Sequence, residues 1–313
     1  MNDHQVLGLH HITAIANDAK RNLDFYTKVL GLRLVKKTVN FDDPGTYHFY
    51  YGNESGTPGT ILTFFPWEGI GTGQNGTGLA THIGFSVAKG AIPFWKERLT
   101  AFNVPFEETE LFSQKTLSFN DPDGLQLQFI EPASPDNKDN RIAWATTDIQ
   151  SQVGIKGFYN VTLTLEKADA TAKVLTDILG YEASKQEGQK LRFIHPHTQT
   201  AGVVDLLEAP NGPRGYNAAG TNHHIAFRVK NDDILMEYRE KVLAAGLQIT
   251  PKIDRDYFFS LYFREPGGVL FELATDNPGF TIDEPLETLG STLKLPKQYE
   301  GMRSKIEKVL PRL

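Results

Sequence analysis

The sequence contains no cysteine among its 313 residues. This absence excludes disulfide bonds, cysteine-ligated zinc sites, iron–sulfur clusters and thiol nucleophiles. Catalytic or metal-binding chemistry must therefore come from histidine, carboxylate, tyrosine, serine, threonine or arginine side chains. The 9 histidines are enough to build a metal site.

Long hydrophobic runs and an excess of positive charge are also missing. No apolar run approaches the roughly 18 residues of a membrane-spanning helix, so we expect no membrane partner. The net charge is −6, from 32 Lys+Arg and 38 Asp+Glu. This balance argues against a nucleic-acid partner, which needs clustered positive charge. The first residues lack the basic-then-apolar build of a signal peptide. We expect a cytoplasmic protein, and a homo-oligomer is compatible with the sequence.

The length predicts two domains, at roughly 150 residues for each. A polar, turn-rich segment separates the two halves of the chain and gives the predicted boundary. We place an N-terminal domain at 1–132, a linker at 133–154, a C-terminal domain at 155–275 and a Pro-punctuated tail at 276–313.

The chain repeats one unit four times. Four segments rich in Ile, Val, Phe and Thr are typical of strands, and they span 9–16, 80–87, 157–165 and 222–229. Each precedes an amphipathic helical pattern, and further strand-like runs follow. The sequence therefore predicts an α+β fold of four βαβββ modules in two domains. Modules 1–79 and 80–132 form the first domain, and two more form the second.

The first strands of three of the four modules carry a histidine at one shared position. His11, His82 and His224 each precede an isoleucine, while the third module has Asn160 there. A lone histidine is usually a packed core or surface residue, and we interpret His82 in this way. We give the same interpretation to the histidines outside the repeat, which are His4, His48, His195 and His197.

The last strands give a second shared position. The turn at 265–268 leads to Glu272, seven residues after its first residue, and the turn at 121–124 leads by the same step to Gln128. Glu272 lies in the apolar run VLFELA, where a carboxylate is costly unless it is paired or bound to a metal.

Two histidines and one carboxylate can bind a divalent metal and leave coordination positions open. If the first and fourth modules share one half-barrel, His11, His224 and Glu272 converge. The half-barrel of the second and third modules would then be free of metal. Neighbouring side chains alternate between the faces of a strand, so only one histidine of each pair should be a ligand. This leaves His10 and His223 as outer donors or acid–base groups.

These features resemble the vicinal oxygen chelate superfamily, which includes glyoxalases, antibiotic-resistance proteins and extradiol dioxygenases. The residues that carry the resemblance are HHIT at 10–13, HHIAF at 223–227 and the Asp/Glu-Pro-x-Gly turns. Segment 9–44 and the four-module length are similar to hydroquinone-type ring-cleaving dioxygenases, including the methylhydroquinone and chlorohydroquinone enzymes.

The resemblance implies an Fe(II) enzyme that opens a hydroquinone or catechol ring, so that an aromatic substrate and O₂ are its partners. It implies His11, His224 and Glu272 as metal ligands, and no further cofactor site. The outer residues that it implies are His10, Thr13, His223, Arg255 and Tyr262.

Three alternatives stay open at the level of sequence. Mn(II) could use the same ligands as Fe(II). A glyoxalase-like isomerase or thiol transferase could use a similar metal set without consuming O₂. A non-catalytic protein of the same fold could bind a small molecule.

Overall fold

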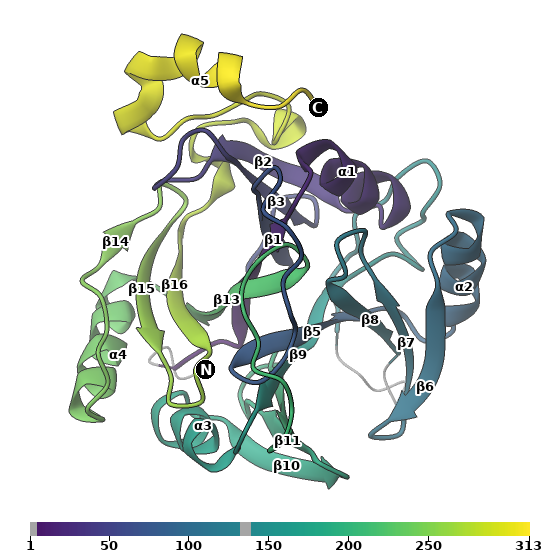
Figure 1. Cartoon of the computed structure of the whole chain (residues 1–313), viewed down its shortest axis with the longest axis vertical. Helices are drawn as coiled ribbons and strands as arrows, with labels where there is room; N and C mark the ends of the chain where they lie inside the picture. The colour runs from purple at the N-terminus through teal and green to yellow at the C-terminus, as the bar shows by residue number, and fades with distance from the viewer. Residues whose placement is uncertain (1–4, 132–138) are drawn as a thin grey trace.

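A computed structural model of the chain describes residues 5–131 and 139–313. His4 and residues 132–138, which include the start of the predicted linker, lie outside the described residues. The described part confirms the four predicted βαβββ modules (Figure 1). The strands of the first two modules are β1 (Leu9–Ala16), β2 (Arg33–Val39), β3 (Tyr47–Gly52), β4 (Ile61–Pro66), β5 (Leu79–Ser86), β6 (Phe106–Leu111), β7 (Gln114–Asn120) and β8 (Gln126–Ile130). Those of the last two are β9 (Gly157–Leu165), β10 (Glu182–Glu187), β11 (Lys190–Ile194), β12 (Val203–Glu208), β13 (Thr221–Val229), β14 (Ile253–Asp254), β15 (Phe258–Arg264) and β16 (Leu270–Pro278).

Each module has its helix after the first strand. The helices are α1 (Ala19–Asp24) continuing into the π-helical turn η1 (Phe25–Val29), α2 (Ile92–Ala101), α3 (Asp169–Lys173) continuing into η2 (Val174–Ile178), and α4 (Asp232–Ala244). Asp18 caps the first helix, because its side chain accepts a hydrogen bond of 2.7 Å from the backbone N–H of Arg21. A glycine with positive φ follows three of the helices, as a left-handed helix end requires; these are Gly31, Gly180 and Gly246.

The modules pair across the chain rather than along it. One eight-stranded sheet has the order β14-β15-β16-β13-β1-β4-β3-β2 and contains the first and fourth modules. The other has the order β10-β11-β12-β9-β5-β8-β7-β6 and contains the second and third. We call these the outer-module sheet and the inner-module sheet. Each takes one module from either side of the predicted linker, and the division into domains at 133–154 stays a prediction.

The two faces of each sheet have different chemistry because side chains alternate along a strand. Apolar residues face the helices: the Tyr26 ring lies 4.5 Å from Phe64 of β4, and the Trp95 ring lies 4.2 Å from Phe129 of β8. Thr63 immediately precedes Phe64, and Gln128 immediately precedes Phe129, so these two polar side chains point to the opposite face of their sheets. The same alternation in β16 places buried Glu272 on the face opposite Phe271 and Leu273.

The tail lies against β2 at one end of the molecule (Figure 1). Its helical turns are η3 (Phe280–Ile282), η4 (Leu286–Thr288), η5 (Lys297–Met302) and α5 (Arg303–Val309). The fully buried ammonium of Lys36 in β2 contacts Asp283 and Glu284 at 2.5 Å each. This triad fixes the tail to the outer-module sheet. Among the described residues, no helix is both long and apolar enough to cross a membrane.

Replacing Lys36 with Met should lower the free energy of unfolding by about 3 kcal/mol, because removing one partner leaves a buried charge unpaired. Urea unfolding monitored by circular dichroism measures this value. Lys37→Met is the matched control, since Lys37 is the next residue along β2 and is only partly buried; its effect should stay within about 0.5 kcal/mol. Equal effects of the two substitutions would contradict the role of the triad.

Candidate metal centre

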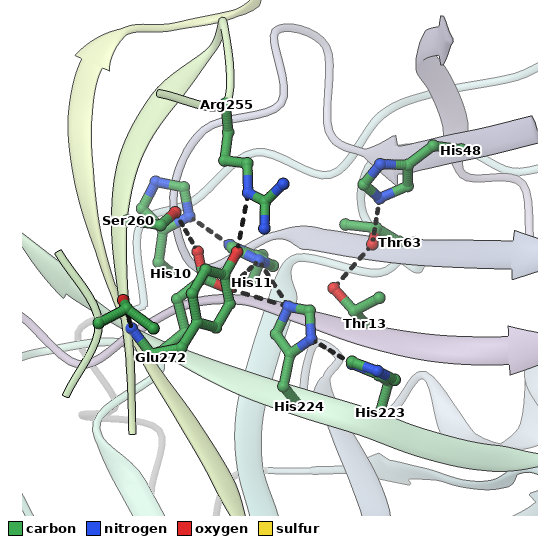
Figure 2. A network of polar contacts seen from close by, with 12 residues as sticks. His10, His11, Thr13, His48, Thr63, His223, His224, Arg255, Ser260 and Glu272 are labelled. Atoms are coloured by element: carbon green, nitrogen blue, oxygen red, sulfur yellow. Dashed lines mark hydrogen bonds and ion pairs between the residues drawn. The ribbon is translucent and has the colours of Figure 1, made fainter. Parts of the chain in front are cut away.

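Three buried side chains from three strands converge in the outer-module sheet. His11 comes from β1, His224 from β13 and Glu272 from β16. Glu272 Oε2 lies 3.2 Å from His11 Nε2 and 2.9 Å from His224 Nε2, and the two imidazole nitrogens lie 3.4 Å apart. Figure 2 shows the three groups pointing toward one another. They could hold one metal ion.

Strand pairing explains why residues so far apart in the sequence meet. In the antiparallel β1–β13 pair His11 lies opposite Ala226, and in the parallel β13–β16 pair Ala226 lies opposite Glu272. These three residues therefore form one row across the sheet. His224 lies two residues before Ala226 and points to the same face. The small side chain of Ala226 leaves room between His11 and Glu272, the two candidate ligands that flank it.

His10 determines which nitrogen of His11 faces the cluster. His10 Nε2 lies 3.1 Å from the carbonyl oxygen of Thr275, and its Nδ1 lies 2.9 Å from His11 Nδ1. A carbonyl only accepts, so His10 Nε2 donates to it. Burial lowers the pKa of His10 well below its usual value, so the neutral ring accepts the Nδ1 hydrogen of His11. His11 Nε2 is then the nitrogen available to a metal.

The fourth module repeats this contact. His223 Nδ1 lies 2.8 Å from His224 Nδ1, and the two rings meet edge to face. Burial is the main cause that lowers the pKa of His224, and burial with the charge of His224 lowers the pKa of His223 to about 3. When the ring hydrogen of His224 is on Nδ1, it is donated to His223 Nδ1, and the lone pair of His224 Nε2 points toward Glu272. The second histidine of each pair thus joins the cluster, and the first contacts its Nδ1.

The carboxylate of Glu272 provides the test of whether the residues fit a metal. Ser260 donates a short hydrogen bond to its Oε1, while Oε2 is buried without a conventional hydrogen-bond donor and has only the two imidazole nitrogens beside it. Burial alone would raise the pKa of Glu272, but His11 and His224 hold it well below its usual range. A charged oxygen beside two nitrogen ligands fits a divalent cation.

A cavity of about 420 Å³ opens in front of the cluster. Its walls are largely aromatic and aliphatic, from Phe41, Phe65, Trp67, Ile253, Phe258 and Leu270. Thr13, His223, Arg255 and Tyr262, which the family resemblance implied as outer residues of the site, also line it. His10 does not line the cavity, because its ring lies behind His11 and contacts Thr275.

Arg255 and Tyr262 form one unit in the cavity wall. Tyr262 lies in β15 directly opposite Glu272, and Arg255 lies in the loop before that strand. Arg255 Nε donates a hydrogen bond of 3.3 Å to the Tyr262 hydroxyl. Burial and the charge of Glu272 raise the pKa of Tyr262. The phenol therefore stays protonated and its own hydrogen can be donated to a ligand.

Sequence reasoning missed three polar residues of the first module that belong to the site. His48, Tyr50 and Thr63 are buried, and His48 and Tyr50 line the cavity. His48 is buried with both ring nitrogens hydrogen-bonded, as expected of a packed histidine, and its side chain also lines the cavity. Strand register contains the missing signal: Tyr50 lies opposite Thr63 as Tyr262 lies opposite Glu272.

The inner-module sheet has a different polar cluster at the equivalent place. Asp205 in β12 takes the register position of Glu272, which sequence alignment missed because no Asp/Glu-Pro-x-Gly turn precedes β12. Arg192 donates to both carboxylate oxygens of Asp205 at 2.8 Å each, and Asn160 donates at 2.6 Å. A guanidinium thus neutralises this carboxylate. His82 is partly exposed and contacts Thr81.

Comparison with known proteins gives one family over most of the chain. A sequence profile described as the Glyoxalase/Bleomycin resistance protein/Dioxygenase superfamily matches residues 8–129 and 158–273. These two ranges contain all three residues of the candidate metal centre.

Individual relatives match along nearly the whole length. A protein of Bacillus subtilis (strain 168), provisionally named ring-cleaving dioxygenase MhqO, is 46% identical over 306 residues, covering 98% of this chain and 96% of that protein. The chlorohydroquinone/hydroquinone 1,2-dioxygenase of Sphingobium indicum is 34% identical over 309 residues, covering 96% of this chain and 95% of that protein. A crystal structure of a provisionally named dioxygenase from Bacillus subtilis subsp. subtilis str. 168 has a TM-score of 0.93 at 44% identity, covering 99% of this chain and 98% of that one.

Substitutions in the cluster should remove metal binding. After anaerobic loading with Fe(II) or Mn(II) and desalting, we expect His224→Ala and Glu272→Gln each to lower bound metal at least about tenfold, because each would remove a candidate ligand. Inductively coupled plasma mass spectrometry measures the metal per chain. His82→Ala is the matched control, since His82 holds the equivalent position in the inner-module sheet, and it should bind as much metal as the wild type. Full metal content in Glu272→Gln would contradict the ligand assignment.

Proposed function

The chain belongs to the glyoxalase/bleomycin resistance protein/dioxygenase superfamily, and we propose that it is an Fe(II)-dependent ring-cleaving dioxygenase. Its substrates would be hydroquinone- or catechol-type aromatics, which it opens with O₂. The main support is the convergence of the buried His11, His224 and Glu272, of which the two histidines line an aromatic-walled cavity. The relatives that match along nearly the whole length are named ring-cleaving and hydroquinone dioxygenases, and these names support the same function.

His11, His224 and Glu272 would hold the iron. Two imidazoles and one carboxylate on one side of an ion leave adjacent positions open. When bound there, the ion would acidify a phenol and bring it beside O₂. The chain's own contribution at this level is to fix the ligands: the Nδ1 contacts of His10 and His223 orient the two imidazoles, and Ser260 orients the carboxylate.

The cavity walls would orient the aromatic ring. Phe258 lies with its ring centre 4.9 Å from that of His11, and Phe65 lies 5.8 Å from His223, so aromatic rings lie beside the cluster and beside its neighbour His223. Offset and edge-to-face contacts of this kind stabilise a bound aromatic ring. A ring held in one orientation presents its hydroxyl group to the cluster, which lowers the entropic part of the barrier.

Arg255, Tyr262 and His223 would handle charge and protons. The Tyr262 hydroxyl, which accepts from Arg255, can donate its hydrogen to an oxygen on which negative charge develops. His223 is neutral at pH 7 and lines the cavity; because its Nδ1 accepts from His224, its Nε2 carries the ring hydrogen and can donate a hydrogen bond to a bound ligand. His10 would act by orienting His11, because Thr275 and His11 occupy both of its ring nitrogens.

The proposed reaction predicts consumption of one O₂ for each ring opened. An oxygen electrode with the Fe(II)-loaded protein and a panel of hydroquinones and catechol measures the uptake, and mass spectrometry with ¹⁸O₂ should find both labelled atoms in the product. Glu272→Gln should lose uptake together with iron. Turnover of methylglyoxal and glutathione without O₂ uptake would favour the isomerase alternative. Binding of hydroquinone without any product would favour the non-catalytic alternative.

Tyr262→Phe should lower kcat for the best hydroquinone by about 10- to 100-fold, because a hydrogen bond to a charged acceptor contributes about 1.5–3 kcal/mol. Bound iron should be unchanged, since the hydroxyl is not a ligand. Steady-state O₂ uptake gives kcat, and metal analysis gives the iron content. Tyr216→Phe, at a tyrosine that is 55% exposed, is the control and should leave kcat unchanged. An unchanged kcat in Tyr262→Phe would exclude this role.

A further inference from the structure

Four polar side chains of the first module form one hydrogen-bonded chain beside the metal cluster. The Tyr50 hydroxyl lies 2.9 Å from His48 Nδ1, His48 Nε2 lies 2.9 Å from Thr63 Oγ1, and Thr63 Oγ1 lies 2.9 Å from Thr13 Oγ1. Figure 2 shows the part from His48 through Thr63 to Thr13, which ends close to the cluster. Thr13 lies two residues after His11 on the same face of β1.

The hydrogens in this chain can be arranged in one direction. Thr63 donates its hydroxyl hydrogen to Thr13, so Thr63 Oγ1 must receive the hydrogen on His48 Nε2. His48 is buried and uncharged, because burial is the main cause that holds its pKa well below the usual value. Its Nδ1 therefore has a lone pair and accepts from the Tyr50 hydroxyl. Each group donates toward Thr13.

The direction of the chain leaves the Thr13 hydroxyl hydrogen free. Thr13 Oγ1 accepts from Thr63, and among the described residues it has no second hydrogen-bond partner. The Thr13 side chain lines the cavity. A buried hydroxyl that already accepts from its strand neighbour is therefore left to donate into the space where a ligand would lie.

The fourth module builds a matching arrangement on the other side of the cluster. His48 lies two residues before Tyr50 in β3, as Ser260 lies two residues before Tyr262 in β15. Ser260 donates to Glu272, and His48 donates to Thr63 at the equivalent register position. One half of the sheet thus fixes a carboxylate ligand, and the other half fixes a pair of threonine hydroxyls.

We propose that His48, supported by Tyr50, is a positioning residue that fixes the Thr13 hydroxyl as a hydrogen-bond donor to an oxygen atom of the aromatic substrate. The inference rests on the proposed function, because it places a phenolic oxygen in the cavity. The rings around His48 hold its orientation: Tyr50 lies 4.0 Å and Phe65 lies 4.4 Å from it, centre to centre. Phe280 of the tail packs against Tyr50 from outside at 5.1 Å.

A double-mutant cycle on substrate binding tests this proposal. The dissociation constant of hydroquinone is measured anaerobically by titration calorimetry on the Fe(II)-loaded full chain, where no turnover occurs. Thr13→Val should weaken binding about tenfold, since a hydrogen bond to an ionised oxygen is lost. His48→Phe should weaken it about fivefold, because the hydroxyl is no longer oriented. The double variant should bind like Thr13→Val alone, whereas independent effects would multiply to about fiftyfold.

A conservative variant separates positioning from simple packing. In His48→Gln, Oε1 can accept from Tyr50 and Nε2 can donate to Thr63, so the direction of the chain is kept and affinity should return to within about twofold of the wild type. His82→Phe is the control for loss of a histidine in the other sheet and should not change affinity. Iron content and circular dichroism should match the wild type in all variants.

The outcomes distinguish this inference from the proposed function. Multiplicative losses in the double variant, or no rescue by His48→Gln, overturn the role of His48 even when the wild type cleaves hydroquinone. A wild-type protein that binds no hydroquinone anaerobically and consumes no O₂ overturns the proposed function, and the inference falls with it. A double variant that binds like Thr13→Val alone, together with restored affinity in His48→Gln, supports the proposed series of hydrogen bonds from Tyr50 to Thr13.

Discussion

The pairing of β1 with β13 is the contact on which the site depends. These strands belong to the first and last modules, and they run antiparallel with His11 opposite Ala226 and Thr13 opposite His224. The pairing fuses two half-sheets into one and brings imidazoles from both ends of the chain to the same face. Glu272 joins them because β16 pairs with β13 in parallel. A shift of one residue in either pairing would turn a ligand to the helix-covered face.

The geometry of the site depends on the convergence of His11, His224 and Glu272, and equally on the hydrogen bonds that these side chains make on the side away from the cluster. A metal-binding histidine almost always donates the hydrogen of its other ring nitrogen to an acceptor, which fixes the tautomer and the orientation of the ring. Here the acceptor is the preceding histidine in both modules, and in the first module the Thr275 carbonyl completes the series. Ser260 holds the other oxygen of Glu272. The candidate ligands are thus oriented by neighbouring polar groups, which have few other hydrogen-bond partners in the buried sheet.

The repeat and the three residues that converge could be predicted from the sequence because both depend on local patterns. Strand composition, glycine at helix ends and the His-Ile position are each visible within about ten residues, and the repeat superimposes them. The Glu272 position followed from one turn motif, and Asp205 was missed because a different loop precedes β12. The contact of His48 with Thr63 could not be predicted from the sequence, because the two residues lie in different strands. The Nδ1 contact between adjacent histidines was also unexpected, since strict alternation separates neighbours. Register irregularities lie next to both histidine pairs.

The cross-chain pairing also sets an order for synthesis on the ribosome. The inner-module sheet draws its strands from residues 79–208, so both of its modules exist once about two thirds of the chain has been made. β1 is made first and yet its partner β13 begins only at Thr221. The first module must therefore persist with an open strand edge while the other sheet closes. Such long-range pairing slows folding and exposes the unpaired edge to other chains. The nascent outer-module sheet is accordingly the part of this protein that most needs protection before release.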